Sequence, residues 1–217
     1  MHYALTLGPE TLQALPSGAL HWPARNLLAV SDLHLGKSAR LARRGGALLP
    51  PYETRATLEK LDADIAATAP ATVICLGDSF DDLAAPDQMD ESDRLWLIRL
   101  MAGRHWIWVE GNHDPGPLAL GGTHLAQTTI GALTFRHIAD PAETFDISGH
   151  YHPKARLAGQ ARTCFLADRH RIILPAYGIF TGGLWCDHPT LAGLMQPGAL
   201  AILTGARARA IPMPHPS

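Results

Sequence analysis

Three short apolar runs mark the first half of the chain, at residues 26–30, 71–76 and 105–109. None of them alternates cleanly between apolar and polar residues, which is typical of strands that are covered on both faces. Each run is followed by a polar stretch that contains glycine. The pattern therefore predicts three buried strands, each followed by a loop.

Segments whose apolar residues have helical spacing separate these strands. Residues 54–67 and 90–102 carry apolar side chains three or four positions apart, and Gly103 supplies a stop for the second segment. Strands and helices in this order predict parallel strands with right-handed crossovers, whose carboxyl ends share the edge where ligands bind. The positions expected to face the sheet are Leu58, Leu61 and Ile65 in the first helix, and Leu95, Ile98 and Met101 in the second.

The second half of the chain changes character, because short strand candidates follow one another with turn residues between them. This pattern predicts a second, mixed or antiparallel sheet packed on the first, in a fold of the α/β class. The candidates are residues 132–136, 144–148, 162–166, 171–174 and 200–204.

The composition fits one folded domain over residues 1–217, because 47% of the residues are hydrophobic and the chain can bury one substantial core. The proline-rich tail, residues 212–217, is expected to be poorly ordered.

A net charge of −2 excludes a globally basic nucleic-acid coat. No apolar stretch reaches the roughly 18 residues of a membrane span, and three cysteines without CxxC spacing indicate reduced thiols in the cytoplasm.

Candidate ligands and proton donors follow the predicted strands. The sequence reads SDLH after the first, GDSFDD after the second, GNHD after the third and GHYH after residues 144–148. Asp32 and His34 are two positions apart, so on an extended segment both side chains would point the same way and could grip one cation. His150 and His152 repeat this spacing.

Three further residues have roles that their chemistry suggests. The two oxygens of Asp78 can bridge two ions roughly 3.5 Å apart. Asn112 offers a neutral carbonyl oxygen, and His113 beside it would point elsewhere and stay free for proton transfer. Each motif alone could be a structural turn or cap. Four strand ends with Asp, His, Asn and His at ligand spacing together predict a metal centre.

The motifs DLH, GDSFD, GNHD and GHYH, in this order, resemble those of the calcineurin-like metallophosphoesterase superfamily over residues 32–152. The resemblance implies two packed mixed β-sheets flanked by helices, a four-layer αββα sandwich. It also implies two divalent ions: one held by Asp32, His34 and His152, the other by Asn112, His137 and His150, with Asp78 between them.

The superfamily has a lone histidine between its third and fourth motifs, for which this chain offers His137 and His124. His137 is preferred, because it follows the strand-like ALTFR. The resemblance makes His113 the leaving-group acid, acting with Asp78 and Asn112 as the catalytic set, and Asp81 fits best as a hydrogen-bond partner of a ligand. Oxygen and nitrogen ligands favour Mn²⁺, with Fe or Zn in related enzymes, and paired ions would activate a bridging water.

Two longer stretches, DLHLGKSARLARRGGALLPP and ILPAYGIFTGGL, resemble the ligase-associated DNA damage response endonucleases called PdeM. This resemblance extends over residues 27–184. It implies a manganese-dependent phosphodiesterase of single-stranded DNA that is encoded beside a DNA ligase, a helicase and an exonuclease. The substrate class comes from the resemblance, because the spacing of the motifs does not supply it.

Several other residues could contact DNA. Arg136, Lys154 and Arg156 flank the histidine motifs, and their direction is left open. Tyr177 and Phe180 are candidates for stacking on unpaired bases, although aromatic residues near glycine turns are more often core anchors. Four basic residues after the first motif could track phosphates or form a solvated basic face: Lys37, Arg40, Arg43 and Arg44.

Two other functions stay open at this point. The same metal core serves many esters, so the chain could be a phosphatase or pyrophosphatase acting on a small nucleotide or lipid precursor. It could also be a catalytically silent scaffold of the same fold, but such scaffolds can lose ligands or the acid, and this chain keeps them all. Short-edged sheets often pair, so the sequence is compatible with a homodimer.

Overall fold

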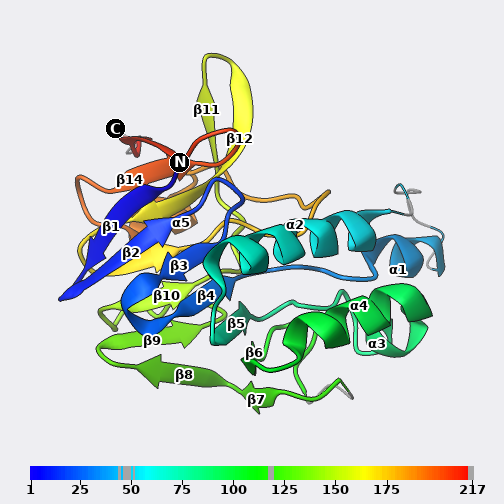
Figure 1. The fold of residues 1–217 in the computed structure, drawn as a ribbon. Coiled ribbons are helices and arrows are strands. Elements are labelled where there is room, and N and C mark those ends of the chain that lie inside the picture. The colour runs from blue at the N-terminus through cyan, green and yellow to red at the C-terminus, as the bar shows by residue number, and fades with distance from the viewer. Residues whose placement is uncertain (44, 46–49, 51, 117–119, 215–217) are drawn as a thin grey trace.

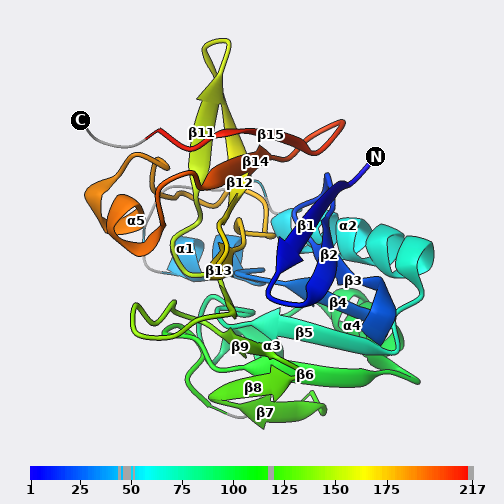
Figure 2. The same cartoon turned by 90° about the vertical axis from the view of Figure 1, so that its left-hand side faces the viewer.

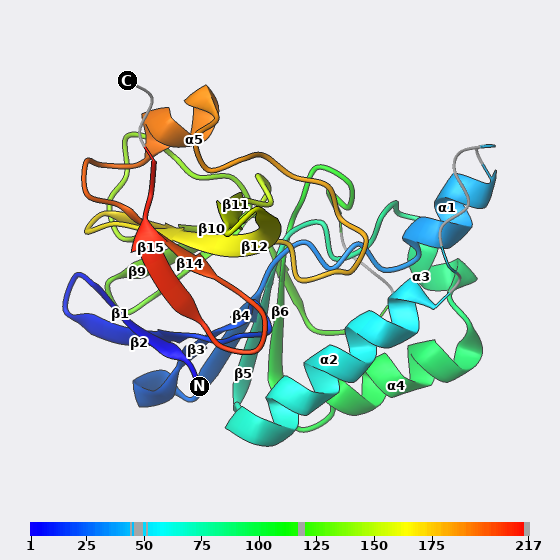
Figure 3. The same cartoon turned by 90° about the horizontal axis from the view of Figure 1, so that it is seen from above.

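Two mixed β-sheets pack face to face, with helices on their outer faces (Figure 1). The computed structural model describes residues 1–43, 45, 50, 52–116 and 120–214. Seen from above, α2 (Glu53–Thr68) and α4 (Glu91–Met101) lie together on one side of the strands, and α5 (Pro189–Leu194) lies on the other (Figure 3). This is the α/β sandwich that the sequence predicted.

The first sheet has seven strands in the order β1-β2-β3-β4-β5-β6-β7. The pairs from β1 to β4 are antiparallel and those from β4 to β7 are parallel, so the last four strands end at one edge. The crossover from β4 to β5 contains α1 (Lys37–Arg43) and α2, and that from β5 to β6 contains α3 (Ala85–Gln88) and α4. The strands are β1 (Tyr3–Leu7), β2 (Glu10–Ala14), β3 (Leu20–Trp22), β4 (Leu27–Val30), β5 (Thr72–Leu76), β6 (His105–Val109) and β7 (Thr123–Leu125), with a 3-10 turn at Pro23–Arg25.

The second sheet has eight strands, in the order β15-β14-β12-β13-β10-β9-β8 with β11 paired to β12. It is mixed, because β10 pairs parallel with β9 and β13 while the other pairs are antiparallel. β11 and the adjoining part of β12 project from the body as a hairpin (Figure 2). The strands are β8 (Gln127–Ile130), β9 (Leu133–Arg136), β10 (Asp146–Ser148), β11 (Lys154–Leu157), β12 (Gln160–Ala167), β13 (Arg171–Ile173), β14 (Leu200–Leu203) and β15 (Arg209–Pro212).

Alternation along the strands divides the apolar side chains among three layers. In β4, Leu27 belongs to the layer between the sheets, and Leu28 belongs to the layer under α2 and α4. Leu191 and Leu194 of α5 cover the outer face of the second sheet. The central strands are covered on both faces, which is why β4, β5 and β6 read as continuous apolar runs.

The predicted buried strands correspond to β4, β5 and β6, and the predicted helices to α2 and α4. Leu58, Leu61 and Ile65 of α2 are buried, as expected. The hairpin of β1 and β2 adds an antiparallel extension that the sequence analysis did not predict, although its apolar residues alternate. The three cysteines are free and buried, in agreement with reduced thiols.

The prediction for the tail is wrong at its start. Pro212 pairs with Leu200 in the second sheet. Met213 is buried, and its backbone nitrogen donates to the carbonyl oxygen of Ala199 at 2.9 Å. Residues 215–217 lie outside the described residues. Within the described ranges, no helix has both the length and the apolar character needed to cross a bilayer.

The face of α4 that packs on the sheet is not the predicted one. Leu97 is 1% exposed and Leu100 is buried, whereas Leu95 is 56% exposed and Ile98 is also exposed. The sequence LWLIRLM satisfies helical spacing in two registers. The position of α4 on the sheet decides between them, and that position depends on residues far away in the sequence.

Replacement of Leu97 tests this register. Leu97→Ala should lower the free energy of unfolding by about 2–5 kcal/mol, because it leaves a cavity between α4 and the sheet. Leu95→Ala is the matched control and should change it by less than about 0.5 kcal/mol. Urea unfolding followed by circular dichroism measures both, and equal losses in the two variants would contradict the register.

Candidate metal centre

Five loops meet at the edge where the parallel strands end. Three of them follow β4, β5 and β6 of the first sheet, and two follow β9 and β10 of the second. Packing of the two sheets brings the loops together. The residues they contribute are Asp32, His34, Asp78, Asn112, His137, His150 and His152, the seven ligands expected from the sequence.

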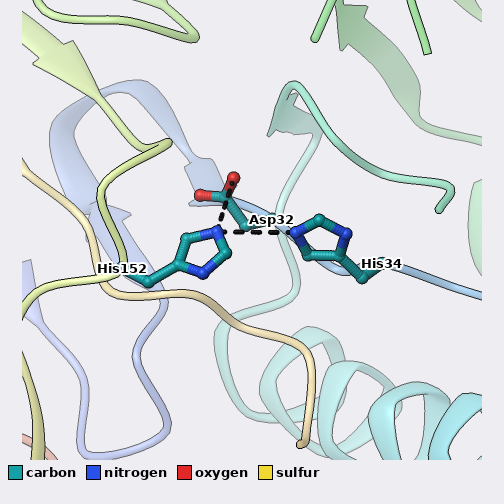
Figure 4. A group of neighbouring side chains, drawn as sticks. All are labelled: Asp32, His34 and His152. Carbon is teal, nitrogen blue, oxygen red and sulfur yellow. Dashed lines mark hydrogen bonds and ion pairs between the residues drawn. The ribbon is translucent and has the colours of Figure 1, made fainter. Parts of the chain in front are cut away.

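The first group of side chains consists of Asp32, His34 and His152 (Figure 4). His152 Nε2 lies 3.2 Å from Asp32 Oδ1 and 3.5 Å from His34 Nε2. Atoms held roughly 2 Å from a shared ion are separated by about 3 Å. The spacing of this group therefore suits a cation between its three members.

The second group consists of Asp78, His137 and His150, with Asn112 beside it. His137 Nε2 lies 3.4 Å from Asp78 Oδ2, 3.2 Å from His150 Nδ1 and 3.0 Å from Asn112 Oδ1. His137 Nδ1 donates to the carbonyl oxygen of Leu76 at 2.9 Å, which leaves Nε2 as the nitrogen that faces the group.

The two groups are neighbours, and Asp32 of the first group contacts residues of the second. Its Oδ2 accepts from the backbone nitrogen of His150 at 2.9 Å, and its Oδ1 lies 4.0 Å from His137 Nδ1. Asp78, expected between the two ions, lies within the second group, and its Oδ1 accepts from the backbone nitrogen of His113 at 2.8 Å. Asp32 is thus the carboxylate that contacts residues of both groups.

Five of the seven candidate ligands have left-handed backbones. Their φ angles are +53° for Asp32, +48° for His34, +46° for Asp78, +70° for His150 and +48° for His152. The expected extended segment is therefore wrong, and a coiled loop brings Asp32 and His34 together. Such conformations cost on the order of 1 kcal/mol or more each, and strained backbone of this kind clusters at functional sites.

A second layer of polar contacts orients the ligands. His34 Nδ1 donates to Asp81 Oδ1 at 2.8 Å, as expected for Asp81, and Arg40 Nε donates to Asp81 Oδ2. Ser31 Oγ donates to Asp32 Oδ2 at 2.5 Å. Partners of this kind hold a histidine ring or a carboxylate in the orientation that a metal needs.

Asp114 is a buried residue that the sequence analysis passed over. Its carboxylate accepts from the backbone nitrogens of Asp78, Ser79 and Phe80 at 2.9, 2.8 and 3.1 Å, and from that of Gly111 at 3.1 Å. Burial, together with the charge of Asp78, raises the pKa of Asp114 to about 6. Its place at the end of GNHD was the available signal, but nothing in the spacing indicated that it ties two loops together.

The charges of the site compensate one another. Burial alone would raise the pKa of Asp78, but His137 and the contacts from His113 outweigh it and lower that pKa to about 2. Burial also opposes ionisation of Asp32, yet the close imidazole of His152, the charge of His137 and the hydroxyl of Ser31 lower its pKa. Burial and the neighbouring His137 lower the pKa of His150, which favours the neutral form that binds metals.

The donor set fits divalent cations. Within the described ranges, Asp32 Oδ1 is buried and accepts no hydrogen bond of good geometry, although His152 Nε2 is near. Two pairs of imidazole nitrogens also face each other, His34 with His152 and His137 with His150. A cation bound between the facing nitrogen atoms and the unsatisfied carboxylate oxygen would give each of these atoms a partner.

His113 lies beside the metal ligands in a separate orientation. Its Nδ1 donates to the carbonyl oxygen of Asp81 at 3.0 Å, and its ring meets that of His34 edge-on at 5.1 Å. His34, Asp81 and His113 form a third close group, but Asp81 already accepts from His34 and Arg40. His124, the alternative lone histidine, lies in β7 against Trp108 and outside the three groups found in the described chain.

The basic residues after the first motif have different environments. Arg40 is tied to Asp81, and Lys37 is a half-buried residue at the start of α1. Arg43 is the last residue of α1, and Arg44 lies outside the described residues. Arg136 donates to Asp140 at 3.2 Å and lines a cavity of about 410 Å³ beside Asn112 and His137.

Fold and site together define a metal-dependent phosphoesterase, a hydrolase of ester bonds. The chain belongs to the calcineurin-like phosphoesterase family, whose sequence pattern matches residues 25–200. Members of this family use divalent metals, which agrees with the donor set.

One similar solved structure is the crystal structure of Pseudomonas putida nuclease MPE. It has a TM-score of 0.75 and 26% sequence identity to this chain, and the match covers 97% of this chain and 100% of that chain. No curated protein matches the chain.

Gly149 provides a test of the close packing at the first group. A Cβ atom there would overlap Ser31 Oγ and press on Asp32 Oδ2. Gly149→Ala should therefore lower metal retention and slow metal-dependent hydrolysis by about 100-fold, as expected for a displacement of about 1 Å. Elemental analysis after dialysis and hydrolysis of bis(p-nitrophenyl) phosphate measure the two effects.

The control is Gly193→Ala in α5, where a Cβ atom meets nothing within 4 Å. Alanine is the better helix former, so metal content and hydrolysis should stay at wild-type levels. Wild-type metal content and activity in Gly149→Ala would show that the loops do not need this contact.

Proposed function

We propose that the protein is a manganese-dependent endonuclease that hydrolyses phosphodiester bonds of single-stranded DNA, and that it is a PdeM-like enzyme of nucleic-acid repair. The observation that carries the proposal is the pair of facing ligand groups with His113 beside them. The similarity to a solved nuclease over nearly the whole chain supports a nucleic-acid substrate. The nitrogen and oxygen ligands favour Mn²⁺ over softer metals.

The residues have distinct tasks in this reaction. Bound divalent ions supply Lewis acidity toward the phosphoryl oxygens and an acidified water. Asp32, Asp78 and the histidines hold the ions in adjoining positions. His113 Nδ1 donates to the Asp81 carbonyl, so Nε2 is the atom that passes a proton to the departing oxygen.

The resemblance to PdeM extends the proposal to partners and location. We propose a cytoplasmic protein that works with a DNA ligase, a helicase and an exonuclease. A half-buried lysine at the start of α1, Lys37, would contact a phosphate that flanks the scissile one.

The substrate test compares single-stranded DNA, duplex DNA, a nucleoside monophosphate and bis(p-nitrophenyl) phosphate, each with Mn²⁺, Mg²⁺ or a chelator. Internal cleavage of the single strand with Mn²⁺, abolished by the chelator, is expected. Hydrolysis of the monophosphate without cleavage of either DNA would instead identify a small-molecule phosphatase.

His113→Ala tests the assignment of the acid. The contact of residue 113 with Asp78 comes from its backbone nitrogen, so the variant should keep its metal while kcat falls by about 100-fold to 10,000-fold. Metal analysis and turnover with a saturating oligonucleotide measure this. Loss of bound metal would make His113 a ligand and refute its role as acid.

Lys37 and Arg40 should behave differently. Lys37→Ala should raise the KM for single-stranded DNA, most strongly at low salt, while hydrolysis of bis(p-nitrophenyl) phosphate is kept. Arg40→Ala frees Asp81, the partner of His34, and should slow hydrolysis of both substrates by about 10-fold to 100-fold. A loss confined to DNA in Arg40→Ala would make Arg40 a phosphate contact instead.

A further inference from the structure

Residues 177–186 form a segment between β13 and α5 that lies against the loops of the first ligand group (Figure 3). The backbone nitrogens of Tyr177 and Gly178 donate to the carbonyl oxygens of Ser31 and Asp32 at 2.7 and 3.0 Å. A Cβ atom at Gly183 would overlap the carbonyl oxygen of His152. The segment is therefore built onto the backbones of two candidate ligands.

One part of this segment exposes an aromatic pair. Phe180 is 45% exposed and Tyr52 is 55% exposed, and their rings meet edge-to-face at 6.1 Å. In an edge-to-face contact, one ring presents its edge to the other. The neighbour therefore does not cover either face of that ring. Phe180 also has a φ of +57°, which is an uncommon and strained backbone conformation for an aromatic residue.

Tyr177, the other aromatic candidate of this stretch, is a structural anchor. It is fully buried, its hydroxyl donates to Asp64 Oδ2 at 2.8 Å, and Lys60 Nζ lies 3.8 Å from its ring centroid. Phe180 is two residues from Gly178, so their Cα atoms are at most about 7.6 Å apart. The exposed pair thus lies close to the metal centre without belonging to the core.

The other end of the segment carries a cluster of cations on an aromatic ring. Arg156 Cζ and Lys154 Nζ lie 4.1 and 4.9 Å from the ring centroid of Trp185. The backbone of Leu184 donates to Tyr151 at 3.1 Å and accepts from Lys154 at 2.8 Å, which joins the cluster to the loop that carries His152. Stacking on an aromatic ring orients a guanidinium and leaves its edge free for phosphate.

We propose that this segment, with Tyr52, Lys154 and Arg156, is the rim that holds the DNA strand. One unpaired base stacks on the pair of Tyr52 and Phe180, and phosphates on the opposite flank meet Lys154 and Arg156. Aromatic platforms beside positive charge are the chemistry by which proteins bind unpaired strands without reading sequence. The proposal rests on the proposed function, since it places the scissile phosphate at the metal centre between the two ends.

The first experiment needs no variant. An abasic sugar is placed at each position in turn around the cleavage site of a single-stranded oligonucleotide, and KM is measured with the Mn²⁺-loaded wild-type protein. Stacking of about 1–3 kcal/mol predicts that one position raises KM about 5-fold to 100-fold. A scan in which every position has the same KM overturns the platform.

The second experiment repeats the scan with Phe180→Ala and Tyr52→Ala. Each variant should raise KM for the intact strand and abolish the sensitivity to the abasic position, while kcat and hydrolysis of bis(p-nitrophenyl) phosphate stay within about 2-fold. Leu95→Ala, which removes an exposed apolar side chain from α4, is the control and should keep the wild-type scan. Aromatic variants that keep the abasic sensitivity contradict the proposal.

The cationic end has a separate signature. Lys154→Gln and Arg156→Gln should each reduce the slope of log affinity against log salt by about 0.7, the value for one phosphate contact on a single strand. Arg99→Gln, which removes an exposed charge from α4, should leave the slope unchanged. An unchanged slope in the first two variants removes them from the rim.

The outcomes separate this inference from the proposed function. If the wild-type protein cleaves no single-stranded DNA with Mn²⁺, the function itself fails. If it cleaves DNA but KM is the same at every abasic position and the salt slope is unchanged in Lys154→Gln and Arg156→Gln, the function stands and the rim is refuted.

Discussion

The buried carboxylate of Asp32 is the feature on which the rest of the site depends. It is fully enclosed, and it receives a hydroxyl, a backbone N–H and an approaching imidazole from three different residues. A buried carboxylate is stable only when other groups compensate its charge. Its partners come from the loop after β4 and from the loop after β10, which belongs to the other sheet. The packing of the two sheets against each other therefore brings the residues of the metal centre together.

Regular structure stops where the ligands begin. β4, β5 and β6 are parallel and buried on both faces, so their ends are held in register. That rigid frame supports left-handed backbones at Asp32, His34 and Asp78, which would be costly on a mobile loop. The hydrogen bonds that the Asp114 carboxylate accepts from three successive backbone nitrogens after β5 serve the same purpose. The strained backbone conformations lie at residues whose side chains a bound cation would stabilise.

The segment after β13 completes the site from a distant part of the chain. It anchors on the carbonyl groups of Ser31 and Asp32 and passes against His152. Glycine is needed at positions 178 and 183 because a Cβ atom at either would overlap neighbouring backbone. The same segment carries Phe180, which meets Tyr52, and Trp185, which lies against Lys154 and Arg156. One element thus supports the backbones of two candidate ligands and, in the proposed rim, would offer a surface to a longer substrate.

The sequence by itself determined the central strands β4, β5 and β6, the helices α2 and α4 and the residues that gather at the strand ends, because parallel strands bring the residues that follow them to one edge. It also favoured His137 over His124, from the strand-like run before it. Only the tertiary structure decided which face of α4 is buried, that Arg40 supports Asp81, and that Phe180 meets Tyr52. These features depend on contacts between segments far apart in the chain, and local periodicity contains no information about which distant surface a side chain will meet.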